Sequence, residues 1–79
     1  MKKIDEIWAF VSVDPVLQEE GIAGLQTDRG TFPLVFSSYE SMTKFMPDAQ
    51  QLADDAGITI LVKRYTTTGV VHVVKSERH

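Results

Sequence analysis

The stretch from Gly30 to Glu40 constrains the fold most, because it reads as a turn, a strand and a helix start within eleven consecutive residues. Residues 31–36 form an apolar run with β-favouring side chains, which predicts a strand. Ser37 and Glu40 then stand three residues apart, the spacing of a capping box, so we expect Ser37 to cap the helix that follows. No residue set in the stretch performs a recognisable reaction. It therefore indicates architecture and not chemistry.

The chain has 79 residues and no cysteine. This length predicts one small domain over residues 1–79, with residues 75–79 as a polar tail. Such a domain buries only about 60% of the surface that its unfolded chain exposes, and no disulfide, thiolate metal site or cysteine nucleophile supplements its core. The apolar runs are too short to cross a bilayer. We therefore expect a cytoplasmic protein without a membrane partner.

Apolar alternation and β-branched composition predict strands over residues 4–13, 21–27, 31–36, 58–66 and 70–74. Gly24 indicates a bulge or a close backbone approach in the second of these strands. Asp28-Arg29-Gly30 has the composition of a hairpin loop with glycine at the left-handed position. The segment 70–74 is either a returning fifth strand or an arm exchanged with another copy.

Helical spacing of apolar residues follows the third strand and continues over residues 42–56. Pro47 interrupts it, which predicts a kink or a second helix begun by that proline, and Gly57 is the expected terminator. The sequence thus predicts an α+β fold of order β-β-β-α-β-β. We expect a single, mostly antiparallel sheet of four to five strands with one kinked helix packed on one face.

The first predicted strand is apolar on both faces, which is typical of a strand that is covered on one side and buried in an interface on the other. If the helix covers the face with residues 7, 9, 11 and 13, then Trp8 and Phe10 point the other way. An uncovered aromatic pair on a sheet marks an interface. Trp8 and Phe10 are therefore the predicted interface residues.

The charges segregate along the chain, since residues 1–57 carry four basic and ten acidic side chains and residues 58–79 carry four basic and one acidic. The two regions thus have net charges of −6 and +3. Such a dipolar chain could pair with a second copy of itself or present its basic end to a partner. Together with the small core, this predicts a homodimer or a complex with another protein.

Candidate chemistry is sparse. His72 is the only histidine away from the terminus, and one histidine cannot build a zinc site without distant carboxylates. No serine lies in a Gly-x-Ser-x-Gly elbow, and no glycine-rich phosphate loop is present. We predict no catalytic residue, no metal site and no cofactor. Asp54 and Asp55 are expected to pair with Lys63 or Arg64 of the next strand.

Four basic side chains of the C-terminal region could form a basic patch, which is the minimum for weak contact with nucleic acid: Lys63, Arg64, Lys75 and Arg78. The isoelectric point of about 5.2 and the lack of interleaved aromatic residues argue against stacking on bases. A nucleic-acid partner is therefore not expected, and binding through the C-terminal hairpin is the third hypothesis.

The segment from Phe32 to Phe45, FPLVFSSYESMTKF, resembles the strand-to-helix motif of the SseB-type N-terminal domain. In that motif a Pro-apolar-apolar-Phe strand runs into Ser/Thr-Ser and an acidic helix start. The match covers about a fifth of the chain. The resemblance implies an α/β scaffold that works through protein contacts, and it supplies no catalytic residue.

These observations predict a small non-enzymatic protein-interaction module that associates with itself. The alternative is a small-ligand-binding protein or an enzyme, with a pocket between helix and sheet near Met42, Met46 and Tyr65. That alternative ranks second because no acid and base converge in the sequence.

Overall fold

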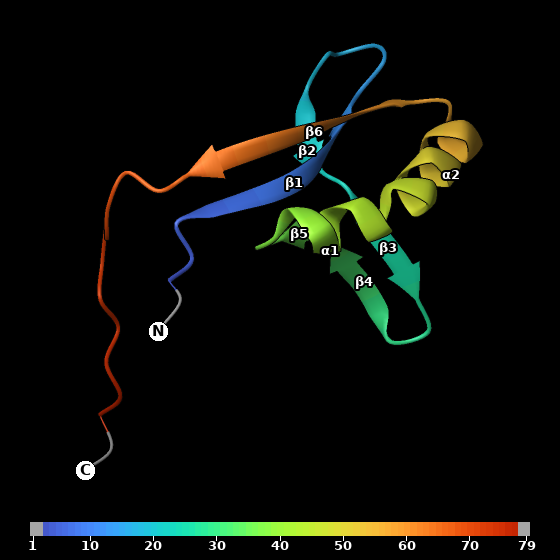
Figure 1. The fold of residues 1–79 in the computed structure, drawn as a ribbon. Coiled ribbons are helices and arrows are strands. Elements are labelled where there is room, and N and C mark those ends of the chain that lie inside the picture. The colour runs from blue at the N-terminus through green and yellow to red at the C-terminus, as the bar shows by residue number, and fades with distance from the viewer. Residues whose placement is uncertain (1–2, 78–79) are drawn as a thin grey trace.

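A computed structural model describes residues 3–77 and confirms an α+β fold in which helices pack on antiparallel strands (Figure 1). The central strand is β1 (Glu6–Val13), and β6 (Thr59–Thr66) pairs with it along its whole length. Four short strands and two helices lie between these two strands in the sequence: β2 (Glu20–Ile22), β3 (Gly24–Thr27), β4 (Gly30–Pro33), β5 (Val35–Phe36), α1 (Tyr39–Lys44) and α2 (Met46–Ala56).

The edge of β1 opposite β6 is occupied by two short strands in line, because β2 pairs with residues 11–13 and β5 pairs with residues 8–9. Between β2 and β5 the chain leaves the sheet as the β3–β4 hairpin. Ala23 and Leu34 mark this exit and return. The Ala23 N–H donates to the Phe10 carbonyl (2.8 Å), the Phe10 N–H donates to the Leu34 carbonyl (3.0 Å), and the Leu34 N–H donates to the Ala23 carbonyl (2.9 Å).

The hairpin excursion is the main difference from the predicted topology. The sequence predicted one sheet with continuous strands over residues 21–27 and 31–36, whereas both segments break and the hairpin forms a separate two-stranded sheet. Gly24 makes the predicted close approach, since a Cβ built there would lie 2.6 Å from Thr31 Cγ2. Gly30 adopts a φ of +119°, which residues with a Cβ rarely take.

The first helix begins one residue later than predicted. Its N-cap is Ser38 and not Ser37, because the Ser38 Oγ accepts a hydrogen bond from the Ser41 N–H at 3.1 Å. The helical segment is divided where the proline predicted it: Pro47 lies in the first turn of α2, where its missing N–H needs no partner. Gly57 ends α2 in the left-handed conformation, as predicted.

The helices cover the face of β1 that carries Phe10, which corrects the predicted orientation. Phe10 is fully buried and packs in one cluster with Met42 of α1 and Ala49 of α2. Its ring lies 5.8 Å from the Phe36 ring in an edge-to-face arrangement. Trp8 lies on the same side at the margin of the cluster. Aromatic side chains bury the largest apolar areas, so this face makes the better core.

The predicted fifth strand is not formed in the structure. Residues 70–74 have no regular secondary structure, and their four valines are between 61% and 96% exposed. The segment leads away from the sheet after β6, as the orange and red part of the chain in Figure 1 shows. The prediction of a strand that returns beside β6 is therefore wrong for the arrangement seen here. Residues 78 and 79 of the predicted tail lie outside the described residues.

Candidate functional site

The face of the sheet opposite the helices is apolar and lies outside the core cluster. Along β1, β2 and β6 its side chains alternate with those that point to the helices, because successive residues of a strand point to opposite faces. Ile22, Leu61 and Tyr65 on this face are between 39% and 52% exposed. Its large apolar members, named the open face from here on, are Ile7, Val11, Ile22, Leu61 and Tyr65; Val11 at the centre is only 3% exposed and Ile7 is half-buried.

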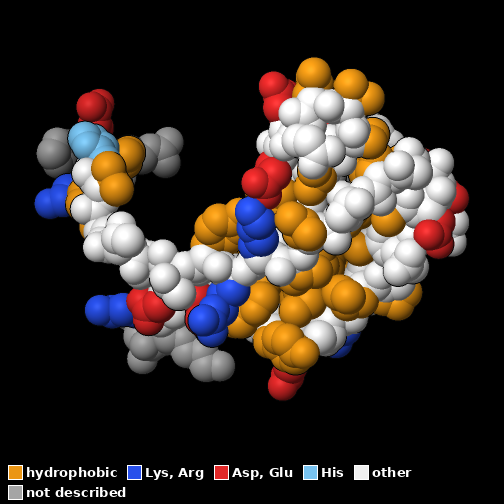
Figure 2. Space-filling model, turned by 90° about the horizontal axis from the view of Figure 1, so that it is seen from above, with side chains coloured by type: hydrophobic (Ala, Val, Ile, Leu, Met, Phe, Trp, Pro, Cys, Tyr) orange, Lys and Arg blue, Asp and Glu red, His pale blue; other side chains and the backbone are white. Residues whose placement is uncertain are grey.

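The open face is continuous across three strands. Val11 is paired with Ile22 on one edge and with Leu61 on the other, and Ile7 is paired with Tyr65. Residues directly opposite each other in antiparallel strands place their side chains on the same face, about 4.5–5.5 Å apart at Cβ. Figure 2 views the molecule from above relative to Figure 1 and shows hydrophobic side chains gathered over the middle of this side.

One ion pair borders the open face. The Lys63 Nζ lies 2.5 Å from the Glu20 Oε1, which joins β6 to β2 across β1. The hydrogen bond to the Glu20 carboxylate raises the pKa of Lys63. Both side chains are exposed, so the pair contributes little to stability. The Lys63–Glu20 pair places one positive and one negative side chain beside the open face.

The predicted basic patch does not assemble. Lys63 and Arg64 are consecutive on β6 and point to opposite faces, and the Arg64 Nε lies 4.0 Å from the Glu6 Oε2 on the helix side. Lys75 belongs to the C-terminal segment, and Arg78 lies outside the described residues. The described members of the set are therefore spread over separate surfaces.

The expected pairing of the acidic end of α2 with β6 is also wrong. The carboxylates of Asp54 and Asp55 accept hydrogen bonds from the side-chain amides of Gln50 and Gln51, at 3.0 and 2.8 Å. These are contacts between residues four apart on one helix. The carboxylates of Asp54 and Asp55 therefore find their hydrogen-bond donors within α2.

The predicted interface residues also require correction. Phe10 is fully buried in the core of the chain, so it cannot form an exposed interface in this fold. Trp8 is partly buried and its ring contacts Tyr39 of α1, with centroids 6.3 Å apart. Periodicity could not choose between the faces because both were apolar.

The pocket predicted near Met42, Met46 and Tyr65 does not form. Met42 is buried in the core, and Met46 lies in the first turn of α2. Tyr65 is on the open face, on the other side of the sheet. The helices and the sheet pack through the core cluster, and a cavity of about 80 Å³ between α2 and β6 is lined by Met46 but by neither Met42 nor Tyr65.

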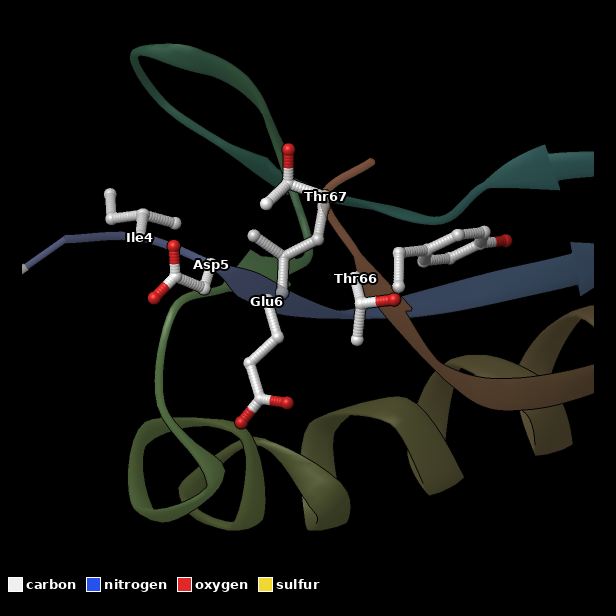
Figure 3. A pocket seen from close by; sticks show the side chains of 7 residues that line it. Ile4, Asp5, Glu6, Thr66 and Thr67 are labelled. Carbon is white, nitrogen blue, oxygen red and sulfur yellow. The ribbon is translucent and has the colours of Figure 1, made fainter. Parts of the chain in front are cut away.

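A cavity of about 220 Å³ lies where β1 begins and β6 ends. Figure 3 shows its lining, in which the Asp5 and Glu6 side chains point in different directions and do not converge on one point. Ile7 and Tyr65 also line it, so it continues the open face. Within residues 3–77, no three histidine, aspartate or glutamate side chains are grouped so that they could hold a metal ion.

A second cavity, of about 330 Å³, lies between the β3–β4 hairpin and the junction of the two helices, and it is lined by Leu25, Phe32, Pro33, Leu34, Phe36 and Phe45. The rings of Phe36 and Phe45 stack with centroids 4.9 Å apart. The lining consists of apolar side chains throughout. This cavity has the size of a small-ligand site.

The carboxylate of Asp14 accepts two backbone hydrogen bonds in the turn after β1. The N–H groups of Leu17 and Val16 donate to its Oδ1 at 2.7 and 2.8 Å. These two hydrogen bonds lower the pKa of Asp14, whose ordinary value is 3.8. The cause is the turn that follows β1. The shift therefore reflects local structure and does not indicate a catalytic acid.

Sequence reasoning did not assign Ile22, Leu61 or Tyr65 to an interface. The available signal was the alternation along residues 59–66, which puts Leu61 and Tyr65 on one face of the strand and Ile60 and Val62 on the other. Both faces of β6 are apolar, as are both faces of β1. The signal therefore becomes useful only after the helix-covered face of β1 is known.

No protein-family model matches the chain, no curated protein matches its sequence, and no solved structure matches its fold. The similarity of residues 32–45 to the SseB-type N-terminal domain therefore stays a prediction. In the part of the chain that the structure describes, neither helix is long and apolar enough to cross a membrane.

Proposed function

We propose that this chain is a non-enzymatic protein-interaction module that associates with a second copy of itself through the open face. The observation that carries the proposal is that one face of the sheet is covered by helices, whereas Ile22, Leu61 and Tyr65 on the other face remain 39% to 52% exposed. Contiguous exposed apolar residues rimmed by charges are typical of interaction surfaces. We expect the protein to act in the cytoplasm, where a chain without cysteine needs no oxidising environment.

The composition of the open face suits a symmetric contact. In a two-fold dimer the same patch meets itself, so a residue of one copy faces a residue of the other and the reverse contact is repeated. The Lys63–Glu20 pair offers both charges at the margin of the patch, so each copy can present a cation to an anion of its partner. Tyr65 is the natural anchor, since tyrosine is enriched among residues that dominate binding energy.

The geometry of three carboxylates, Asp5, Glu6 and Asp14, favours a binding role over catalysis at these positions. Asp5 and Glu6 at the cavity of Figure 3 point apart, and a candidate base must lie within hydrogen-bond reach of the proton that it takes. The lowered pKa of Asp14 arises within its own turn.

The test is the molar mass in solution, measured by size-exclusion chromatography with light scattering over a range of concentrations. Leu61→Lys should shift the equilibrium towards monomer, because a charge would replace an apolar side chain inside the contact. Leu17→Lys is the matched control, since Leu17 is 67% exposed in the loop after β1 and should leave the molar mass unchanged. A wild-type chain that is monomeric up to millimolar concentration would refute the proposal.

A second candidate function is the binding of a small apolar ligand in the cavity of about 330 Å³ beside Phe36 and Phe45. Indole is a suitable probe because it matches an aromatic, apolar lining. Titration followed by NMR should shift the resonances of Leu25 and Phe45, and Tyr65 on the open face is the internal reference. Uniformly small shifts at all three residues would exclude this candidate for ligands of the indole class.

A further inference from the structure

One long edge of the sheet is open to strand pairing. Within residues 3–77, β6 pairs with β1 and with no other strand, so its outer edge presents unpaired backbone groups over eight residues. An exposed strand edge of this length is a template for pairing with another chain. Charged side chains such as Lys63 and Arg64 commonly prevent pairing at a strand edge. Here both form ion pairs with carboxylates of their own chain.

The pairing pattern shows which backbone groups of β6 face outward. Both backbone groups of Phe10 bond to Ala23 and Leu34 on the far edge of β1, so Phe10 cannot bond to its opposite residue Val62. Backbone groups alternate in direction along an antiparallel strand. The N–H groups of Ile60, Val62 and Arg64 therefore point away from β1, whereas those of Leu61 and Lys63 point towards it.

A shallow apolar groove runs beside this edge on the helix side. It has a volume of about 80 Å³ and is lined by Met46, Ala49, Gln50, Ala53, Ile60 and Val62. A cavity of about 150 Å³ accommodates benzene, so this groove suits one branched aliphatic side chain. A strand added to β6 would place alternate side chains in the groove and on the open face.

The segment Val70–Val74 has the composition of such a strand. Four of its five residues are valines, which favour the pleated conformation, and they are between 61% and 96% exposed. Five residues in a strand span about 17 Å, which is shorter than β6. An extended peptide segment can add to an open sheet edge as a further strand.

The start of the segment directs it away from its own β6. The Thr67 N–H donates to the Asp5 carbonyl at 2.8 Å, so the chain continues along β1 beyond the end of β6. The Gly69 N–H then donates to the Thr67 hydroxyl at 3.1 Å, and Gly69 has a φ of +142°. In Figures 1 and 2 the segment stands apart from the body of the molecule. Its valines therefore remain exposed and are available for pairing.

We propose that Val70–Val74 of one copy, continued by Lys75, adds as an antiparallel strand to the free edge of β6 in a second copy. This inference rests on the proposed self-association and names the segment that carries it. We place Val73 opposite Val62, so that the Val73 side chain enters the groove beside α2. The exchange is reciprocal, because the edge and the segment of each copy are both used in a two-fold dimer.

Charge complementarity supports this direction of the added strand. With Val73 opposite Val62, Lys75 lies opposite Ile60, which lines the groove together with Ala53 near the end of α2. The last turn of α2 carries Asp54 and Asp55 and no basic residue. A cation at a helix C-terminus is stabilising because it offsets the negative end of the helix dipole. A parallel strand would carry Lys75 to the opposite end of β6.

Amide hydrogen exchange on the full-length chain tests the proposal directly. At a concentration where the wild type is dimeric, the amides of Ile60, Val62 and Arg64 should be protected. Val73→Pro removes one N–H and disrupts the added strand, so these amides should exchange at least tenfold faster while Leu61 and Lys63 stay protected. Val73→Thr keeps the N–H and the branched side chain and should retain the protection. Rapid exchange of the three outward amides in the wild type would overturn the proposal.

The chain has no cysteine, so single cysteines can identify the partner of the segment. A mixture of Val62→Cys and Val73→Cys chains should form a covalent heterodimer under mild oxidation, because paired residues lie within disulfide distance. Val16→Cys is the control for random collision, since Val16 is 83% exposed on a distant loop. Cross-linking no better than this control would overturn the proposal, and so would amide protection that persists in dilute, monomeric samples.

The two proposals fail in different ways. If Leu61→Lys disrupts the dimer but the outward amides of β6 exchange rapidly in the wild type, the strand addition is refuted and the self-associating module still holds. A chain that is monomeric at every concentration removes both. If the dimer depends on Val73 and not on Leu61, the strand addition still holds and the open face is refuted as the main contact.

Discussion

Substitution of Phe10 by alanine distinguishes most sharply between a core and an interface role for the first strand. Phe10 has no exposed surface and contacts the core cluster on the helix side, where its ring lies 5.8 Å from the Phe36 ring. If Phe10 were an interface residue, the substitution would weaken association and leave the monomer stable. In the structure it instead opens a cavity in the only core cluster that the described residues form.

The expected magnitude is large for a chain of this size. Replacing a buried phenylalanine by alanine costs about 3–5 kcal/mol, because transfer free energy is lost and a cavity remains. A chain of 79 residues has a total stability of roughly 4–12 kcal/mol at about 0.05–0.15 kcal/mol per residue. The substitution should therefore remove between about a quarter and all of the free energy of unfolding.

Urea unfolding followed by fluorescence measures this loss, since Trp8 is the single tryptophan and lies at the margin of the core cluster. Phe10→Leu keeps an apolar side chain, loses less free energy, and stays measurable if Phe10→Ala does not fold. Phe32→Ala is the matched control, because Phe32 is 51% exposed on the hairpin. All samples are compared at one protein concentration. A loss at Phe10 below 1 kcal/mol, or no larger than that at Phe32, would refute the core assignment.

Three further outcomes are expected. Ser38→Ala should lower the free energy of unfolding by about 0.5–2 kcal/mol through loss of the cap on α1, whereas Ser37→Ala should change the urea midpoint much less; the reverse order would contradict the cap. Gly24→Ala should destabilise by about 1–3 kcal/mol, because its Cβ would lie 2.6 Å from Thr31 Cγ2. Thr31→Ser removes that methyl group, so adding it to Gly24→Ala should restore part of the lost stability. If the two substitutions instead change the free energy of unfolding additively, the Gly24–Thr31 contact is not the cause of the loss. The pKa of Asp14 is lowered from its ordinary 3.8, so its contribution is present above that pH and is lost as the pH falls through the folded-state pKa. The difference in stability between the wild type and Asp14→Ala should shrink on acidification below about pH 4, and an NMR titration that gives an ordinary pKa for Asp14 would count against the two backbone hydrogen bonds.

Local signals in the sequence predicted several elements well. The proline and glycine positions marked the division between α1 and α2 and the end of α2, because these residues restrict the backbone by themselves. The strand β6 was predicted over residues 58–66, one residue longer than the observed Thr59–Thr66. The cap was misplaced by one residue, since Ser37 and Ser38 are adjacent and either could bond a backbone N–H of the first turn.

Features that depend on distant contacts were not predictable from the pattern. Both faces of β1 are apolar, so periodicity could not show that the helices cover Phe10 and leave Val11 on the open face. The breaks at Ala23 and Leu34 depend on hydrogen bonds to Phe10, and neither residue is a turn former. Valines at 70–74 favour a strand by composition, but a strand also requires a partner edge, which composition does not provide.

The pairing of β1 with β6 has a consequence for how the chain reaches its native state. Glu6 pairs with Thr66 and Val13 pairs with Thr59, which are separations of 60 and 46 residues by subtraction of these numbers. Contacts between residues so far apart in sequence slow folding, because the loop must close before the pairing stabilises it. During synthesis β1 emerges long before its full-length partner. The β3–β4 hairpin and the two helices can form from local contacts before β6 is synthesised. They would cover one face of β1 while the edge that later pairs with β6 is still unpaired.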